Sequence, residues 1–324
     1  MLTLLTRIGT GITLATLAFG ALAQPAFPGK PITLVVPFAA GASADLIART
    51  VGRELSTELG QPVIVENKPG AGGALGLLAV ARAPADGYTI GLGATGAIAV
   101  GPHLPDAPPL NPQRDLVALG KLADIPLVLV ASASSEFRDL KSFLNAARKA
   151  PDGLSYGQSG QYTSQHLAGE LLANMAQVRL MAVPYKGSGP AVTDLLGGNI
   201  PAAVVDLTSA YPHIKAGKLV ALGVTSANPT KVAPEIPAIA QEGVPGYSAS
   251  AWMGLFLPAK TPTEVRTKLS VAMHKVMQLQ AVEAQITRLA AEPAYMDGPA
   301  FTVFIAQESK KWAEVVKRIP APAK

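Results

Sequence analysis

The 324-residue sequence contains no cysteine. Disulfides, thiolate metal sites and cysteine nucleophiles are therefore excluded. Charged residues make up only 15% of the chain, below the roughly 25% that is usual in soluble proteins, and aromatic residues make up 5%. The net charge of +5 is scattered, with no run of Lys or Arg interleaved with aromatic rings. We therefore expect no nucleic-acid partner.

Long apolar runs are missing after the first 23 residues, so we expect no membrane-spanning segment in the mature chain. The first 23 residues themselves have the pattern of a cleaved signal peptide. Arg7 supplies a positive charge, residues 8–22 form an apolar run, and Ala21 and Ala23 frame a cleavage site. A membrane anchor is the alternative, but the run is short and glycines dilute it. We therefore expect export to the periplasm.

The stretch after the signal peptide alternates between a strand pattern and a helix pattern. An apolar run at residues 32–36 stops at Pro37, small residues follow, and then Ile47, Val51 and Leu55 recur every fourth residue. This pattern predicts a strand, a tight loop and an amphipathic helix. The start of such a helix points free backbone N–H groups and the positive end of its dipole outward. Carboxylates and phosphates are suited to that place.

The alternation of strands and helices continues along the chain, which is long enough for two domains. It predicts parallel sheets with helices on both faces. Four loops rich in small residues follow predicted strands, at residues 38–44, 94–96, 157–164 and 186–190. Because ligands of open α/β sheets bind outside the carboxyl ends of the strands, we interpret these loops as parts of an anion pocket.

Three local predictions concern the rest of the chain. Residues 261–289 are expected to form one long helix that begins with a capping box at Thr261 and has Pro262 at its first position. Residues 101–115 contain five prolines and are expected to be irregular. Trp252 follows a segment rich in Pro and Gly and is expected to lie in the core or in a hinge.

Several chemical functions lack their motifs. Residues 70–76 miss the third glycine of a dinucleotide-binding loop, and the four histidines are far apart with no metal-ligand spacing. We therefore expect no cofactor and no metal. Residues 157–161 miss the nucleophile elbow of a hydrolase by one position. A secreted serine hydrolase using Ser159 or Ser164 with His166 nevertheless stays as an alternative, although His166 is better explained as a packing or capping residue.

Short motifs recur in a fixed order over nearly the whole mature chain. They are FPGKPI at 27–32, VPF with Gly41, Asp45 and Arg49 at 36–49, VENKPGAGG at 65–73, DGYT at 86–89, YG, SG and HLAGE within 156–170, VPYKG at 183–187 and PHIKAGK at 212–218. Together they resemble the Bug-type, or TctC-type, periplasmic solute receptors of tripartite tricarboxylate transporters.

This resemblance implies an α/β fold of two domains, a Venus flytrap of the type II periplasmic binding protein kind, in which each domain is a mostly parallel sheet flanked by helices. Residues 24–126 and 255–324 would form the first domain, and residues 127–254 the second. The protein would be a monomer and no enzyme. It would bind a small carboxylate between its domains and deliver it to the membrane subunits of a transporter.

The resemblance also implies the binding residues. The loop at residues 39–43 would hold one carboxylate from the first domain, and Ser159, Thr163 and Ser164 would hold the other end from the second. Lys186 is equally well explained as a solvated residue at the rim. The full set of expected ligand-binding residues is Phe38, Ala39, Ala40, Gly41, Ala42, Ser43, Ala94, Thr95, Ser159, Gly160, Tyr162, Thr163, Ser164, Tyr185, Lys186, Gly187 and Asp206.

This chain departs from the usual family pattern in ways that bear on its ligand. Its first loop contains alanines where prolines and a second glycine are usual, Leu207 replaces a common Asn, and Tyr162 adds an aromatic ring. Fewer polar anchors and one more ring suggest a ligand less hydrophilic than citrate, and our hypothesis is an aromatic or otherwise apolar carboxylate. A subunit that presents its ligand to a signalling protein is a further alternative.

Overall fold

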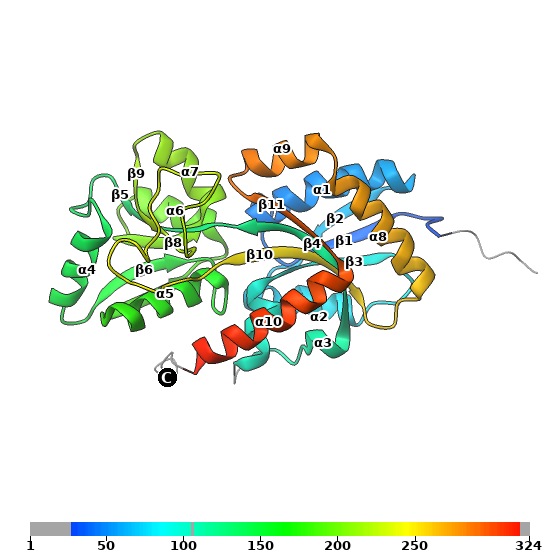
Figure 1. Cartoon of the computed structure of the whole chain (residues 1–324), viewed down its shortest axis with the longest axis horizontal. Helices are drawn as coiled ribbons and strands as arrows, with labels where there is room; N and C mark the ends of the chain where they lie inside the picture. Colours follow the sequence, from blue (N-terminus) through cyan, green and yellow to red (C-terminus); the bar gives the residue numbers. More distant parts are fainter. Residues whose placement is uncertain (1–26, 105–106, 318–324) are drawn as a thin grey trace, which may run out of the picture.

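The computed structural model describes residues 27–104 and 107–317, so the predicted signal peptide lies outside the described residues. Two α/β domains, each built around one β-sheet, lie side by side and are connected by extended strands (Figure 1). Within the described ranges, no helix combines the length and the apolar character needed to cross a bilayer.

The first domain contains a six-stranded sheet in the order β11-β4-β10-β3-β1-β2. Its strands are β1 (Ile32–Val36), β2 (Val63–Asn67), β3 (Thr89–Ala94), β4 (Leu116–Ile125), β10 (Ala251–Pro258) and β11 (Glu292–Asp297). Its helices are α1 (Ser43–Leu59), α2 (Ala74–Ala81), α3 (Pro112–Asp115), α8 (Thr263–Met277), α9 (Gln280–Arg288) and α10 (Gly298–Val316). A buried helical turn at Gly96–Val100 follows β3.

The second domain contains a five-stranded sheet in the order β7-β6-β8-β5-β9. Its strands are β5 (Leu127–Ser132), β6 (Leu154–Gln158), β7 (Leu180–Pro184), β8 (Ala202–Asp206) and β9 (Leu219–Val224). Its helices are α4 (Leu140–Lys149), α5 (Ser164–Ala176), α6 (Ser188–Leu196) and α7 (Leu207–Lys215).

Both sheets are mixed, so the expectation of two α/β domains is confirmed but the expectation of mostly parallel sheets is wrong. β1 pairs in parallel with β2 and β3, whereas β10 runs antiparallel to β3 and β4, and β11 runs antiparallel to β4. In the second sheet β6 is parallel to β7 and β8, and β5 is antiparallel to β8 and β9. The parallel strands are those joined by helical crossovers, while β4, β5 and β10 carry the chain between domains and escape that constraint.

The connection between the domains is short. β4 and β5 follow each other with only Pro126 between them, and β10 brings the chain back into the first sheet. β10 pairs with β4 from Ala251, opposite Ile125. Residues 251–254 therefore lie in the first sheet, although the sequence prediction started this return at residue 255.

Helix α1 follows from its sequence, since Ile47, Val51 and Leu55 are all buried. The single long helix predicted over residues 261–289 is wrong, because α8 and α9 are separate helices that both pack on α1. The predicted capping box is also wrong. Pro262 occupies the N-cap position, and the Thr261 hydroxyl donates to the carbonyl oxygen of Pro258 at 2.8 Å.

A candidate ligand-binding site between the domains

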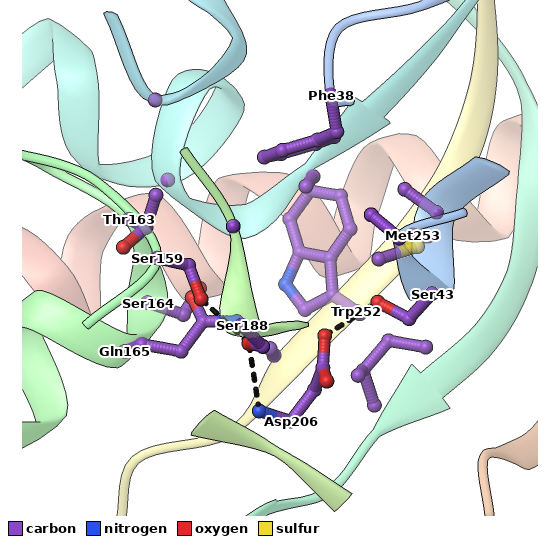
Figure 2. A pocket seen from close by; sticks show the side chains of 18 residues that line it. Phe38, Ser43, Ser159, Thr163, Ser164, Gln165, Ser188, Asp206, Trp252 and Met253 are labelled. Carbon is purple, nitrogen blue, oxygen red and sulfur yellow. Dashed lines mark hydrogen bonds between the residues drawn. The ribbon is translucent and has the colours of Figure 1, made fainter. Parts of the chain in front are cut away.

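A cavity of about 30 Å³ lies between the two domains. It holds no more than two or three water molecules, so the domains are closed on each other in this conformation. Figure 2 shows the side chains that point into it from both domains. Its lining consists of Phe38, Ala42, Ser43, Ala44, Gly72, Ala94, Gly96, Ile125, Ser159, Thr163, Ser164, Gln165, Gly187, Ser188, Asp206, Ala251, Trp252 and Met253.

Four helices begin at this cavity. α1 starts there from the first domain, and α5, α6 and α7 start there from the second. The N-caps of α1 and α6 are Ala42 and Gly187, and neither supplies a side-chain capping hydrogen bond. The first N–H groups of a helix have no partner within it, and the positive ends of four dipoles meet here. Among the described residues, the lining contains no Lys or Arg. Asp206 is the one acidic side chain among the described residues of the lining, so an anion would meet backbone donors and hydroxyls beside that carboxylate.

A chain of hydrogen bonds crosses the cavity wall from the second domain to the first (Figure 2). The hydroxyls of Ser159 and Ser188 lie 2.6 Å apart, and the Asp206 N–H donates to the Ser188 hydroxyl at 3.1 Å. The Ser43 hydroxyl, at the start of α1, donates to Asp206 Oδ2 at 2.5 Å. Asp206 also caps α7 by accepting the Ser209 N–H at 3.2 Å. This chain joins the starts of three helices.

The remaining wall of the cavity is apolar. Phe38 approaches it from the loop after β1, and Trp252 and Met253 approach it from β10 (Figure 2). Trp252 is fully buried, and its backbone N–H donates to the Thr95 hydroxyl at 2.9 Å. Together these side chains give the cavity an apolar, partly aromatic wall next to its hydrogen-bonding groups.

About half of the residues expected from the sequence line this cavity. Those that do are Phe38, Ala42, Ser43, Ala94, Ser159, Thr163, Ser164, Gly187 and Asp206. Those that do not are Ala39, Ala40, Gly41, Thr95, Gly160, Tyr162, Tyr185 and Lys186. Most members of the second group turn outward or are engaged within their own domain, whereas Tyr162 faces a neighbouring cavity that first-domain residues also line.

In the first loop, polar groups form hydrogen bonds within the first domain. The Gly41 N–H donates to Asp45 Oδ2 at 2.9 Å, and the Asn67 amide donates to Asp45 Oδ1 at 2.9 Å and to the Phe38 carbonyl at 3.0 Å. Burial favours a raised pKa for Asp45, but hydrogen bonds from Arg49, Gly41 and Asn67 leave this pKa below its ordinary value of 3.8. Asp45 is therefore ionised and holds the first loop in place.

The second-domain residues outside the cavity have separate roles. Tyr162 has a left-handed backbone (φ +66°), and its ring packs edge-on against His166 and faces a smaller neighbouring cavity. The Gly160 N–H donates to its neighbour Gln158 at 2.5 Å. Tyr185 donates to Asp194 at 2.7 Å on an open surface groove. Lys186 is exposed and outside the lining.

Nine lining residues were not expected from the sequence. They are Ala44, Gly72, Gly96, Ile125, Gln165, Ser188, Ala251, Trp252 and Met253. Gln165 directly follows the loop at residues 157–164, and Ser188 belongs to the loop at residues 186–190. Their positions in the sequence could therefore have identified them. Trp252 and Met253 come from a strand in which no loop pattern marks the site.

Backbone contacts also hold the two domains together. A Cβ on Gly72 would lie 2.9 Å from the Gln161 carbonyl oxygen, and one on Gly96 would lie 2.6 Å from the Tyr162 carbonyl oxygen. Both distances are too short for a real Cβ. The two glycines of the first domain therefore let the loop before α5 rest directly on their backbone.

The geometry does not support a serine hydrolase. His166 Nδ1 accepts the Tyr162 N–H at 3.2 Å, and its Nε2 faces Glu170 at 3.8 Å. Ser159 instead shares its hydrogen bond with Ser188. Burial lowers the pKa of His166 to about 4, which fits a neutral ring that accepts a backbone N–H. In the ranges described, no three His, Cys, Asp or Glu side chains gather in a way that could hold a metal.

Comparison with known proteins adds the family. The model of the tripartite tricarboxylate transporter family receptor, TctC, matches residues 47–320. The chain belongs to this family. It is 38% identical over 313 residues to a UPF0065 protein in the tcbD-tcbE intergenic region of Pseudomonas sp. strain P51, covering 96% of this chain and 93% of the relative. It is 34% identical over 316 residues to protein BugT of Bordetella pertussis, covering 97% of both.

Three solved structures share the fold. R. palustris Rpa4515 with adipate and the periplasmic binding protein BugD each give a TM-score of 0.85 at 31% identity, covering 90% of this chain and 98% of theirs. MatC from Rhodopseudomonas palustris with bound malate gives 0.83 at 29% identity, covering 90% of this chain and 100% of its own. This TctC protein is therefore a solute-binding receptor of the periplasmic binding protein fold and not an enzyme.

Proposed function

We propose that this TctC receptor is exported to the periplasm, binds a small carboxylate with an apolar body between its two domains, and delivers it to the membrane subunits of a tripartite transporter. The observation that carries the proposal is the meeting of four helix starts with an apolar, partly aromatic wall in one interdomain cavity. The relatives with adipate and malate support the choice of a carboxylate.

The helix starts define two ends for the ligand. One carboxylate end meets the N–H groups at the start of α1, next to Ser43. The opposite end meets the starts of α5 and α6, next to Ser164 and Ser188. Charge-assisted hydrogen bonds from backbone N–H groups are stronger than neutral ones. Micromolar affinity needs only about 8 kcal/mol, which several such bonds plus apolar contact can supply.

The apolar wall of the cavity favours an apolar ligand body. Phe38, Trp252 and Met253 line it with two aromatic side chains and a thioether, and removing apolar area from water contributes about 25 cal/mol per Å². A hydroxyl placed against these groups would lose its hydrogen bonds with water and find no replacement. We therefore infer an aromatic or aliphatic acid in preference to citrate or malate.

Binding would work through the closure of the domains. The cavity is too small for such an acid in the present conformation, so the domains must part before the ligand enters and adjust around it when they close. A ligand that bridges both sets of helix starts binds the closed form better and shifts the equilibrium toward it. The membrane subunits would then recognise this closed form of the monomer.

A thermal-shift screen of the purified mature protein tests the proposal. Adipate, benzoate and phenylacetate are expected to raise the melting temperature by several degrees at millimolar concentration, and citrate and malate to raise it less. Stabilisation by citrate and malate but not by the other three acids would reject the apolar ligand. The absence of stabilisation by all five acids would count against a carboxylate receptor.

A further inference from the structure

Both tryptophans of the sequence donate their indole N–H to the same carboxylate oxygen. Glu308 Oε2, on α10, accepts Trp252 Nε1 at 3.2 Å and Trp312 Nε1 at 3.3 Å. The other oxygen, Oε1, accepts Lys311 Nζ at 3.2 Å. Glu308 is 8% exposed and both tryptophans are fully buried. Glu308 does not belong to the cavity lining, whereas Trp252 does.

Helix α10 fixes the Trp252 ring from more than one side. Phe301 and Phe304, also on α10, meet the indole edge-on with ring centres 5.2 and 5.7 Å away. The Thr95 hydroxyl holds the backbone N–H of Trp252. The helix therefore contributes two ring contacts and one directional hydrogen bond to the side chain of a residue that also lines the cavity.

Burying the Glu308 carboxylate is energetically unfavourable. Taking its charge out of water is unfavourable, and packing alone would be served better by an apolar side chain. An indole N–H left without an acceptor in the interior also costs free energy, and an indole can turn about its χ2 to find one. A fixed acceptor removes that freedom, because only one ring orientation satisfies the N–H.

We propose that Glu308 is a positioning residue of the binding site, which fixes the Trp252 indole as the surface against which the apolar body of the ligand packs. This inference rests on the proposed function, since the ligand body is assigned there. Glu308 acts only through Trp252 and touches no ligand atom.

Two substitutions distinguish the effect of the length of the Glu308 side chain from the effect of its charge. Glu308→Gln keeps the length and an oxygen acceptor but loses the charge. Glu308→Asp keeps the charge, but its chain is one methylene shorter and its oxygens fall short of the indole. Both are made in a Trp312→Phe background, so that Trp252 is the only tryptophan and its fluorescence reports on that ring alone.

The readouts are the emission maximum and acrylamide quenching of Trp252, the Kd for adipate and benzoate by calorimetry, and the melting temperature. Trp312→Phe alone is the matched control, because it removes the other indole from the same carboxylate, and its Kd should stay within twofold of the parent protein. Glu308→Gln should leave the emission maximum and the quenching of Trp252 as in that control, and the Kd within twofold of it. Glu308→Asp should shift the emission and weaken the affinity at least tenfold.

Equal effects of the Asp and Gln variants on emission and Kd would overturn the proposal, as would a loss confined to Gln, which would indicate a role for charge. A change in melting temperature alone would indicate packing without positioning and would also overturn it. Failure of the proposed function looks different. In that case neither acid binds the Trp312→Phe control, while the emission shift of the Asp variant still decides whether Glu308 positions Trp252.

Discussion

Ser43 and Asp206, 163 positions apart in the chain, share a hydrogen bond of 2.5 Å across the cleft between the domains. Ser43 opens α1 of the first domain, and Asp206 caps α7 of the second. The bond therefore joins two of the helix starts that we assign to ligand binding. It makes Ser43 part of the closing surface as well as of the candidate anion site.

Replacing Ser43 by alanine should open the receptor. The variant loses a hydrogen bond to a charged acceptor, which contributes roughly 1.5–3 kcal/mol in a buried setting. We expect a larger radius of gyration in small-angle X-ray scattering and an affinity for adipate or benzoate at least threefold lower. Thr302→Ala, whose hydroxyl donates within α10, should change neither value. An unchanged radius together with an unchanged affinity would show that this bond does not hold the domains closed.

Gly96→Ala should hinder closure of the two domains. The new Cβ would lie 2.6 Å from the Tyr162 carbonyl oxygen in the other domain. The backbone at Gly96 has no positive φ, so alanine is tolerated within the first domain. The Cβ would clash with the second domain only when the two domains close. We expect a lower affinity for the same acids with little loss of thermal stability. Gly101→Ala in the same region is the control, because its Cβ would meet only one atom, at 3.4 Å. Equal affinities of the two variants would contradict the closure contact.

The neutral state of His166 predicts a pH dependence of stability. Its pKa falls from the ordinary 6.5 to about 4 on burial, so between these values the unfolded chain binds a proton that the folded chain does not. Stability should therefore fall as the pH is lowered from about 6.5 to about 4, by at most ~3 kcal/mol. Urea unfolding across this range should give a steeper loss for the parent protein than for His166→Gln.

Glu170, next to this histidine, contributes with the opposite sign. Burial raises its pKa, and the hydrogen bond from Tyr156 only partly offsets this, so the folded state takes up this proton more readily than the unfolded state. The comparison between the parent protein and His166→Gln removes this common contribution. Parallel profiles for the two proteins would contradict a buried neutral His166.

Gly169→Ala should destabilise the second domain although it lies in a helix. Alanine gains up to about 1 kcal/mol in helix propensity, but its Cβ would overlap the ring of Tyr156, and overpacking costs about 1–3 kcal/mol. We expect a net loss of about 1–2 kcal/mol in the free energy of unfolding. Gly189→Ala on α6, where a Cβ meets no atom within 4 Å, should be neutral or slightly stabilising. A stabilised Gly169→Ala would show that the Tyr156 ring moves aside freely.

Much of the fold was predictable from local patterns. Ile47, Val51 and Leu55, which recur every fourth residue, predicted α1, and the motifs predicted the two-domain class. The direction of the strands was not predictable in the same way, because an antiparallel strand such as β10 has the same apolar pattern as a parallel one. The break between α8 and α9 was not predictable either, because the two residues between them, Gln278 and Leu279, include no Pro or Gly that would mark the end of a helix.

The candidate site was predictable where it lies at helix starts and less so elsewhere. Ser159 directly follows β6 and Asp206 ends β8, while Ser43 and Ser164 begin the helices that follow β1 and β6. Topology brings such strand ends together. Gly41 and Thr95 looked equally suitable, but their polar groups are engaged with Asp45 and Trp252. That engagement depends on tertiary contacts and could not be predicted from spacing.

The central claim is that converging helix starts hold a carboxylate. Calorimetric titration of the mature receptor with adipate and with its diamide, adipamide, tests this most directly, because the two differ in charge and very little in shape. The account predicts micromolar to submillimolar binding of adipate and at least a hundredfold weaker binding of adipamide. The same comparison can be made between benzoate and benzamide. Equal affinity for an acid and its amide would contradict the anion site, whatever the identity of the natural ligand.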